Sequence, residues 1–157
     1  MKMWQKIKRY FIPCLIPLLT GAISAWLTKD YMTGFVSPPF NLPAWLFPIV
    51  WSVLYILMGV SSGIVYYGYH RNRERALIIY FLQLVLNFSW SIIFFRFALY
   101  NAAAVVLSVM IVLITAMVLE FYKIDYLAGA INVPYLYWCF FALYLNIGVS
   151  FLNWILT

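Results

Sequence analysis

The chain has 157 residues, of which 67% are hydrophobic and only 9% are charged. A water-soluble domain carries about 25% charged residues, so this composition excludes a soluble globular fold. Aromatic residues make up 21% of the chain, and seven of them are tryptophans, which is more than contact with lipid requires. The sequence therefore predicts an integral membrane protein in a lipid bilayer, with too few polar residues for a separate soluble domain.

Five apolar runs are long enough to cross a bilayer as helices, which takes about 20 residues each. They cover residues 10–28, 45–69, 77–97, 102–121 and 130–155. An alternative interpretation of the first run is a cleaved secretory signal, whose removal would leave four spans. The predicted fold is all-α, a single domain over residues 1–157 that forms an integral membrane bundle of five transmembrane helices.

The ten basic residues are unevenly distributed along the chain. Seven of them fall in two clusters, which are Lys2, Lys6, Lys8 and Arg9, and Arg71, Arg73 and Arg75. With five crossings, the chain start, the Arg71 loop and the Lys123 loop share one side, and only Lys29 and Arg96 lie on the other. We expect the protein to lie in a bacterial cell membrane. There the positive-inside rule predicts a cytoplasmic N-terminus and an external C-terminus. The clusters are interpreted as orientation signals, and no nucleic-acid binding is expected without a soluble face.

The one long loop lies between the first two spans, at residues 29–44. Its Gly34, Pro38, Pro39 and Pro43 exclude a continuous helix, since each proline removes a donor and restricts its predecessor. The loop is nevertheless rich in apolar side chains, unlike a flexible polar linker. We expect it to pack on the bundle as a lid, the alternative being a loop that rests among the lipid headgroups.

Polar side chains inside the spans are few, and in the third span they share one face. Gln83, Asn87, Trp90 and Phe94 recur at helical spacing. Amides are costly in hydrocarbon, so this face is predicted to look into the protein. Two interpretations stay open: the amides join neighbouring helices by hydrogen bonds, or they line a cavity for a large, flat, mostly apolar ligand.

The second and fifth spans carry comparable faces. These are Pro48, Trp51, Tyr55, Met58 and Ser62 in the second span, and Trp138, Ala142, Leu145 and Val149, with Asn146 beside them, in the fifth. Repetition of such faces on three helices favours the cavity. The second span also contains the small-residue run Gly59–Gly63, which predicts close contact between helices.

Residue types that carry conventional catalysis are missing from the middle of the spans. The acidic residues, at span ends or in loops, are Asp30, Glu74, Glu120 and Asp125. The single histidine, His70, lies at the end of the second span, so neither a catalytic triad nor buried haem ligation is expected. Cys14 and Cys139 lack metal-ligand spacing and are predicted to be structural thiols. We expect no metal site and no required cofactor.

Three blocks of sequence follow one another in a distinctive order: Ser37–Gly59, with Trp45, Pro48 and Trp51; Gln83–Phe95, with Asn87 and Trp90; and Pro134–Asn146, with Trp138. They resemble the TspO/MBR family, the tryptophan-rich sensory proteins whose animal members are the mitochondrial translocator proteins. With the five-span plan, the resemblance covers essentially the whole chain.

The resemblance implies a five-helix bundle, usually a homodimer, with a ligand cavity beneath the loop that joins the first two spans. Family members bind porphyrins such as protoporphyrin IX, isoquinoline and benzodiazepine drugs and, in animals, cholesterol. By matching position in the family's motifs, the resemblance implies that the cavity is lined by Trp51, Asn87, Trp90 and Trp138, with Pro48, Tyr55, Gln83 and Ala142 as neighbours. The family's cholesterol motif is incomplete here, because Ile147 follows Asn146 and no basic residue follows Lys123, which argues against sterol binding through it.

Three functions are compatible with these features. The first is a membrane receptor or sensor that binds porphyrins and drug-like ligands. The second is light- and oxygen-dependent porphyrin degradation, in which Trp51 and Trp138 would react beside the excited ligand. The third is transport of tetrapyrroles or other hydrophobic molecules, which the absence of an internal repeat and of intramembrane charge makes weaker. Our interpretation is a porphyrin receptor with degradation as a secondary activity.

Overall fold

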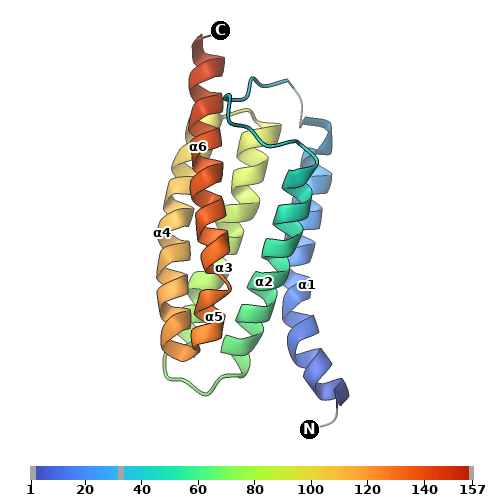
Figure 1. Ribbon diagram of the computed structural model, residues 1–157, viewed down its shortest axis with the longest axis vertical. Coiled ribbons are helices and arrows are strands. Elements are labelled where there is room, and N and C mark those ends of the chain that lie inside the picture. The colour runs from blue at the N-terminus through green and yellow to red at the C-terminus, as the bar shows by residue number, and fades with distance from the viewer. Residues whose placement is uncertain (1–2, 32–33, 156–157) are drawn as a thin grey trace.

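The computed structural model describes residues 3–31 and 34–155, with the side chains of residues 3–10 outside the description. Its elements are α1 (Met3–Thr28), η1 (Lys29–Tyr31), α2 (Leu46–Tyr67), α3 (Arg73–Ser91), η2 (Ile92–Arg96), α4 (Tyr100–Ile124), α5 (Tyr126–Ala130) and α6 (Val133–Ile155). The long helices lie side by side in one bundle, with the two chain ends at opposite ends of it (Figure 1). Within the described residues, five stretches are long and apolar enough to cross a membrane, so the predicted all-α fold with five spans is confirmed.

The helices extend beyond most of the predicted apolar runs, because backbone hydrogen bonding continues through polar residues that hydropathy excludes. The first helix begins at Met3 instead of residue 10. The fifth span, predicted as one run over 130–155, consists of the short α5 followed by α6. Asp125 starts α5, because its carboxylate accepts a hydrogen bond from the backbone N–H of Ala128 at 3.0 Å.

The third span ends in a π-helical turn, η2, which widens the helix before the chain crosses to α4. The backbone N–H of Phe97 donates to the carbonyl of Ile92 at 3.2 Å. Ala98 follows with a φ of 51°, a left-handed conformation that ends the helical segment. The turn carries Phe94 and Phe95, whose rings take part in the aromatic cluster described below.

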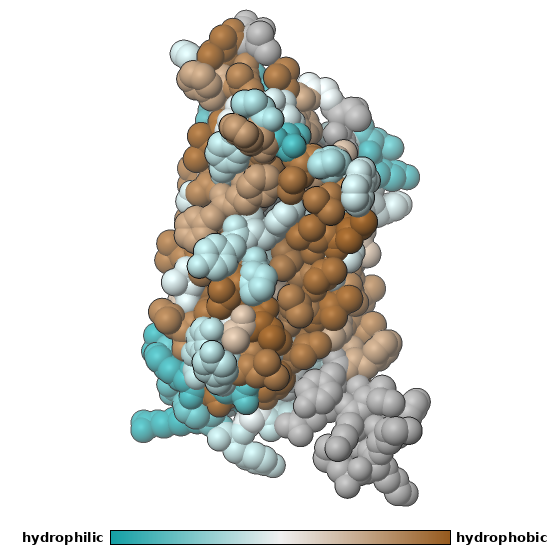
Figure 2. Space-filling model, in the orientation of Figure 1, coloured by the Kyte–Doolittle hydropathy of each residue, from teal (hydrophilic) through white to brown (hydrophobic). Residues whose placement is uncertain are grey.

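The core is built around α4, which packs against both α3 and α6, while α1 packs against α2. Side chains that are fully buried at the centre include Met58, Leu107, Met110, Ile114, Met117 and Phe121. The visible outer surface is mostly hydrophobic along the middle of the bundle (Figure 2). A hydrophobic exterior around a packed interior is the arrangement expected of helices in a bilayer.

The close helix contact predicted from Gly59–Gly63 is confirmed for Gly59. A Cβ atom at Gly59 would overlap the backbone of Cys14 on α1. Likewise, a Cβ atom at Gly21 on α1 would overlap the ring of Tyr55. These two glycines let α1 and α2 approach closely, as small residues do between membrane helices.

Replacing Gly59 with valine tests this contact. The added side chain must push α1 away from α2, so we expect Gly59→Val to lower the free energy of unfolding by about 1–3 kcal/mol. Ala22→Val is the matched control, because Ala22 is exposed on α1. Unfolding of both variants in detergent, followed by circular dichroism, should separate them; equal stability would contradict the close contact.

Candidate ligand-binding site

The loop that follows η1 reaches across to α6 before it returns to α2 (Figure 1). Phe35 anchors it, because its ring lies edge-on to Phe94 at 5.5 Å and to Tyr100 at 6.4 Å between centroids. Such edge-to-face pairs add about 0.5–1.5 kcal/mol each beyond area burial. The loop is therefore held by an aromatic cluster at the junction of α3 and α4.

A second anchor joins the same loop to α6. The side-chain amide of Asn153 accepts a hydrogen bond from the backbone N–H of Val36 at 3.3 Å and donates one to its carbonyl at 3.2 Å. Pro38 is buried, and its ring leaves no room for a side chain at Gly148. The apolar loop thus packs on the bundle at this end and covers the space between helices.

Inside the bundle, Asn87 joins three helices. Its carbonyl oxygen accepts a hydrogen bond from the hydroxyl of Tyr55 on α2 at 2.8 Å. Its amide nitrogen donates to the hydroxyl of Tyr135 on α6 at 3.1 Å. Asn87 is 1% exposed, so these bonds are shielded from solvent and α2, α3 and α6 are tied together at one level.

The network continues through Gln83, one turn away on α3. The hydroxyl of Tyr135 donates to the Gln83 carbonyl oxygen at 2.8 Å. The Gln83 amide nitrogen lies 3.7 Å from the sulfur of Met58 on α2. Tyr135 and Gln83 are both fully buried, so polar atoms that would be costly in hydrocarbon are paired within the protein.

A separate pair of hydrogen bonds lies nearer the loop. The indole nitrogen of Trp90 donates to the carbonyl oxygen of Asn146 on α6 at 3.0 Å. The Asn146 amide nitrogen in turn donates to the backbone carbonyl of Tyr100 at 2.8 Å. These two bonds join α3, α6 and the start of α4, at a level of the bundle separate from that of Asn87.

Trp51 packs among the rings of this interior. Its ring centroid lies 5.6 Å from that of Tyr55, 6.1 Å from Trp90 and 6.2 Å from Tyr135. The predicted inward faces of the second, third and fifth spans therefore meet, and aromatic rings and hydrogen-bonded amides fill the space between them. Gln83, Asn87 and Trp90 act here as interhelical hydrogen-bonding residues.

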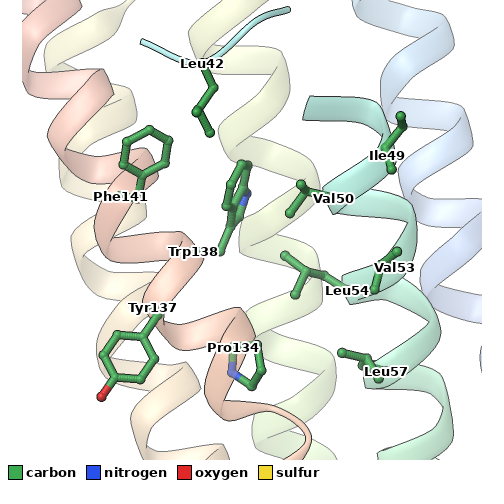
Figure 3. A pocket seen from close by; sticks show the side chains of 10 residues that line it. All are labelled: Leu42, Ile49, Val50, Val53, Leu54, Leu57, Pro134, Tyr137, Trp138 and Phe141. Atoms are coloured by element: carbon green, nitrogen blue, oxygen red, sulfur yellow. The ribbon is translucent and has the colours of Figure 1, made fainter. Parts of the chain in front are cut away.

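A groove of about 640 Å³ lies beside that interior. Figure 3 shows it between α2 and α6, with Leu42 of the loop at one end. Its lining residues are Leu42, Ile49, Val50, Val53, Leu54, Leu57, Pro134, Tyr137, Trp138 and Phe141. Ile49, Val53 and Tyr137 are also exposed on the outer surface, so the groove opens to the lipid.

Trp138 forms the inner wall of the groove and projects between the two helices (Figure 3). Phe47 packs edge-on against its ring, with centroids 5.6 Å apart. The indole nitrogen of Trp138 is buried and has no hydrogen-bond partner among the described residues. A buried donor without an acceptor costs about 1–3 kcal/mol, so this N–H is an unused recognition group.

Eight residues are predicted from the sequence to contact ligand: Pro48, Trp51, Tyr55, Gln83, Asn87, Trp90, Trp138 and Ala142. The structure places Trp138 in the lining of the groove. It brings Trp51, Tyr55, Gln83, Asn87 and Trp90 together in the packed interior, joined by the ring contacts and hydrogen bonds described above. Ala142 is buried, and Pro48 is exposed near the start of α2.

Tyr135 is the central residue that the sequence reasoning missed. It connects Asn87 with Gln83 through its hydroxyl. A period through Tyr135, Ala142, Asn146 and Val149 would have found it, since these residues share the buried face of α6. The face predicted through Trp138 shares Ala142 and Val149 with this one, and Trp138 is only half-buried and reaches the groove.

The described residues offer no cluster of three or more His, Cys, Asp or Glu side chains for a metal ion. Cys14 and Cys139 are both free thiols, and Cys139 is fully buried. The site combines an apolar groove, one unpaired indole N–H and stacked aromatic rings. This arrangement suits binding of a flat apolar molecule and contains no acid–base pair.

Asn87→Leu tests the buried network. The change leaves the hydroxyls of Tyr55 and Tyr135 without their amide partner, so we expect unfolding in detergent to become easier by about 1–3 kcal/mol. Asn41→Leu, an exposed loop amide, is the control and should change stability little. If both variants unfold alike, the network does not hold the helices together.

Comparison with known proteins agrees with this architecture. The TspO/MBR family matches residues 13–152. The chain is 36% identical to the tryptophan-rich protein TspO of Chlorobaculum tepidum over 125 residues, 78% of this chain and 79% of that protein. It is 31% identical to the tryptophan-rich sensory protein of Cereibacter sphaeroides over 151 residues, 96% and 93% of the two chains.

The similarity extends to animal proteins. The translocator protein of Homo sapiens is 31% identical over 119 residues, which are 74% of this chain and 70% of the human protein. Relatives named as sensory and translocator proteins support a role as a membrane sensor or receptor. Five membrane-spanning helices and a match over nearly the whole length lead to one conclusion: the chain is a member of the TspO/MBR family.

Proposed function

We propose that this protein is a membrane receptor for porphyrins, protoporphyrin IX among them, and for benzodiazepine- and isoquinoline-type molecules. The observation that carries the proposal is the groove between α2 and α6, with the unpaired indole N–H of Trp138 at its wall. A volume of about 640 Å³ lies within the range of small-molecule sites, about 300–1,000 Å³.

The chemistry of the groove sets the kind of ligand. Its lining side chains are apolar except for Tyr137 and Trp138, and the Tyr137 hydroxyl points away from it (Figure 3). No cationic side chain lines it, so the part of a ligand inside must be uncharged and flat. In a porphyrin that part is the macrocycle, and its carboxylates would stay at the mouth of the groove.

Trp138 supplies the polar contact in this proposal. A small shift of its half-buried ring would bring the indole N–H to a carbonyl or ring-nitrogen acceptor of the ligand. The ligand would then satisfy a donor that has no partner in the described protein. Because the unpaired donor is costly in the free protein, the hydrogen bond formed on binding contributes to affinity and fixes orientation.

Filling the groove tests where the ligand binds. Val53 lines it from α2, and Ile56 lies on the same helix with a similar exposure but outside the groove. We expect Val53→Trp to weaken protoporphyrin IX binding by at least about tenfold, since overlap costs more than about 1.4 kcal/mol. Ile56→Trp should bind as the wild type does in the same fluorescence titration.

Two outcomes would contradict the proposal. Equal binding by both variants would mean that the ligand occupies another site, and absence of porphyrin binding by the wild type would remove porphyrin as a ligand. An isoquinoline carboxamide should compete with protoporphyrin IX if both use the groove. A competitor that binds without displacing the porphyrin would show two separate sites.

We propose light- and oxygen-dependent degradation of bound porphyrin as a secondary activity, with Trp138 and Trp51 as the reacting side chains. The observation that favours it is the position of Trp138, whose ring lines the groove and would touch a bound macrocycle. Trp51 packs among Tyr55, Trp90 and Tyr135 behind it, so it would react in a second layer.

Illumination of the purified protein with protoporphyrin IX in air tests this activity. We expect the porphyrin absorbance bands to bleach more slowly in Trp138→Phe than in the wild type, and Trp51→Phe to have the smaller effect because of its deeper position. Trp26→Phe is the control, since Trp26 is 66% exposed on α1. Bleaching no faster than in detergent alone would end the degradation proposal and leave the receptor proposal intact.

We also infer the orientation of the chain in a bacterial cell membrane. The turn between α2 and α3, with Arg71, Arg73 and Arg75 in it or just after it, and the end of α4, with Lys123, lie at the end of the bundle where α1 begins (Figure 1). The segments η1 and η2, which include Lys29 and Arg96, lie at the other end. An excess of basic residues is typical of the cytoplasmic side. This distribution supports a cytoplasmic N-terminus and an external C-terminus.

A further inference from the structure

The turn between α2 and α3 carries charge that the proposed receptor function does not use. It contains Arg71, which is exposed, and Arg73, which is half-buried at the first residue of α3. The hydrophilic surface visible in Figure 2 includes the end of the bundle at which this turn lies in Figure 1. Its charges therefore need separate consideration.

Two of the basic residues at this end lie near the same buried carboxylate. Glu120 on α4 has a side chain only 7% exposed, and Lys123 contacts it at 2.8 Å. Arg75 lies 4.0 Å from the same carboxylate oxygen. A buried carboxylate binds such partners more strongly than an exposed one, since water screens it less. Lys123 is thus paired with Glu120, and Arg75 lies at the limit of an ion pair with the same carboxylate.

Arg71 and Arg73 have no ionic partner among the described residues. The carboxylate of Asp125 caps α5. The ring nitrogen Nδ1 of His70 accepts a hydrogen bond from the backbone N–H of Asn72 at 3.1 Å. Glu74 is exposed and makes no ion pair with either arginine.

The tyrosines beside these arginines place the turn at the depth of lipid headgroups. Tyr66 is 56% exposed and Tyr69 is fully exposed at the end of α2. The Arg73 guanidinium lies over the Tyr66 ring at 6.0 Å and donates to the Tyr66 backbone carbonyl at 3.3 Å. Tyrosines gather where membrane helices leave the hydrocarbon, and the phosphates of the lipids lie at the same level.

We propose that the α2–α3 turn is a binding site for the headgroup of an anionic phospholipid, with Arg71 and Arg73 on its phosphate and Tyr66 and Tyr69 beside it. Guanidinium groups match phosphate geometry through paired hydrogen bonds. Arg73 is held by Tyr66 and so loses little freedom on binding, while exposed Arg71 closes over the headgroup. This site is independent of the groove between α2 and α6.

Native mass spectrometry of the full chain in a neutral detergent, titrated with phosphatidylglycerol, tests the site. Each arginine near an anionic lipid is worth about fivefold in affinity, so Arg71→Gln with Arg73→Gln should weaken binding of the first lipid by roughly thirtyfold. The matched control, Lys29→Gln with Arg96→Gln, removes the same charge at the opposite end and should bind as the wild type does. Substitution of both arginines by lysine should retain most of the affinity.

Three outcomes would overturn the proposal. Equal loss in the glutamine variant and in its control would mean that only the overall charge of the chain attracts the lipid. Equal affinity of the wild type for phosphatidylcholine and phosphatidylglycerol would mean that the headgroup charge is not recognised. Displacement of the lipid by an equal concentration of inorganic phosphate would assign the site to a free anion. Circular dichroism checks that each variant is folded. The single variant Arg71→Gln, at an exposed position, should still weaken lipid binding about fivefold.

Discussion

Amides inside a membrane bundle must find their hydrogen-bond partners within the protein, because hydrocarbon offers none. Asn87 meets this constraint by bonding Tyr55 on α2 and Tyr135 on α6. Tyr135 in turn satisfies Gln83. One of these bonds joins α2 to α3 and two join α3 to α6, so the need to pair a few buried polar atoms fixes the register of α2, α3 and α6 against one another.

The groove follows from how this interior is filled. Trp51, Tyr55 and Tyr135 occupy the space between the inward faces, and the network holds them there. Trp138, three residues after Tyr135, is turned out of that interior toward the gap between α2 and α6. The same helix thus supplies a structural tyrosine on one face and, in our proposal, a ligand-binding tryptophan on the next.

The sequence predicted the spans and the buried amides well, because hydropathy and helical spacing depend on local pattern. Gln83 and Asn87 were assigned to an inward face for that reason. Tyr135 lies on the buried face of α6, which helical spacing can predict, but its role in joining Asn87 and Gln83 is not evident until its partners are known. The groove depends on the distance between α2 and α6, which the spacing of residues along the sequence does not encode. The burial of Glu120 likewise depends on how α4 packs in the bundle, with Lys123 at 2.8 Å and Arg75 of α3 at 4.0 Å from its carboxylate.

The most direct test of the central claim follows the indole N–H signals of the protein by NMR as ligand is added. Trp138 lines the groove and its buried indole N–H has no partner among the described residues, whereas that of Trp90 is bonded to Asn146 inside the bundle. With protoporphyrin IX or an isoquinoline carboxamide, we expect a large shift of the Trp138 signal, identified by its loss in Trp138→Phe, and little change at Trp90. A large shift at Trp90 with none at Trp138 would place the ligand in the interior and contradict the account.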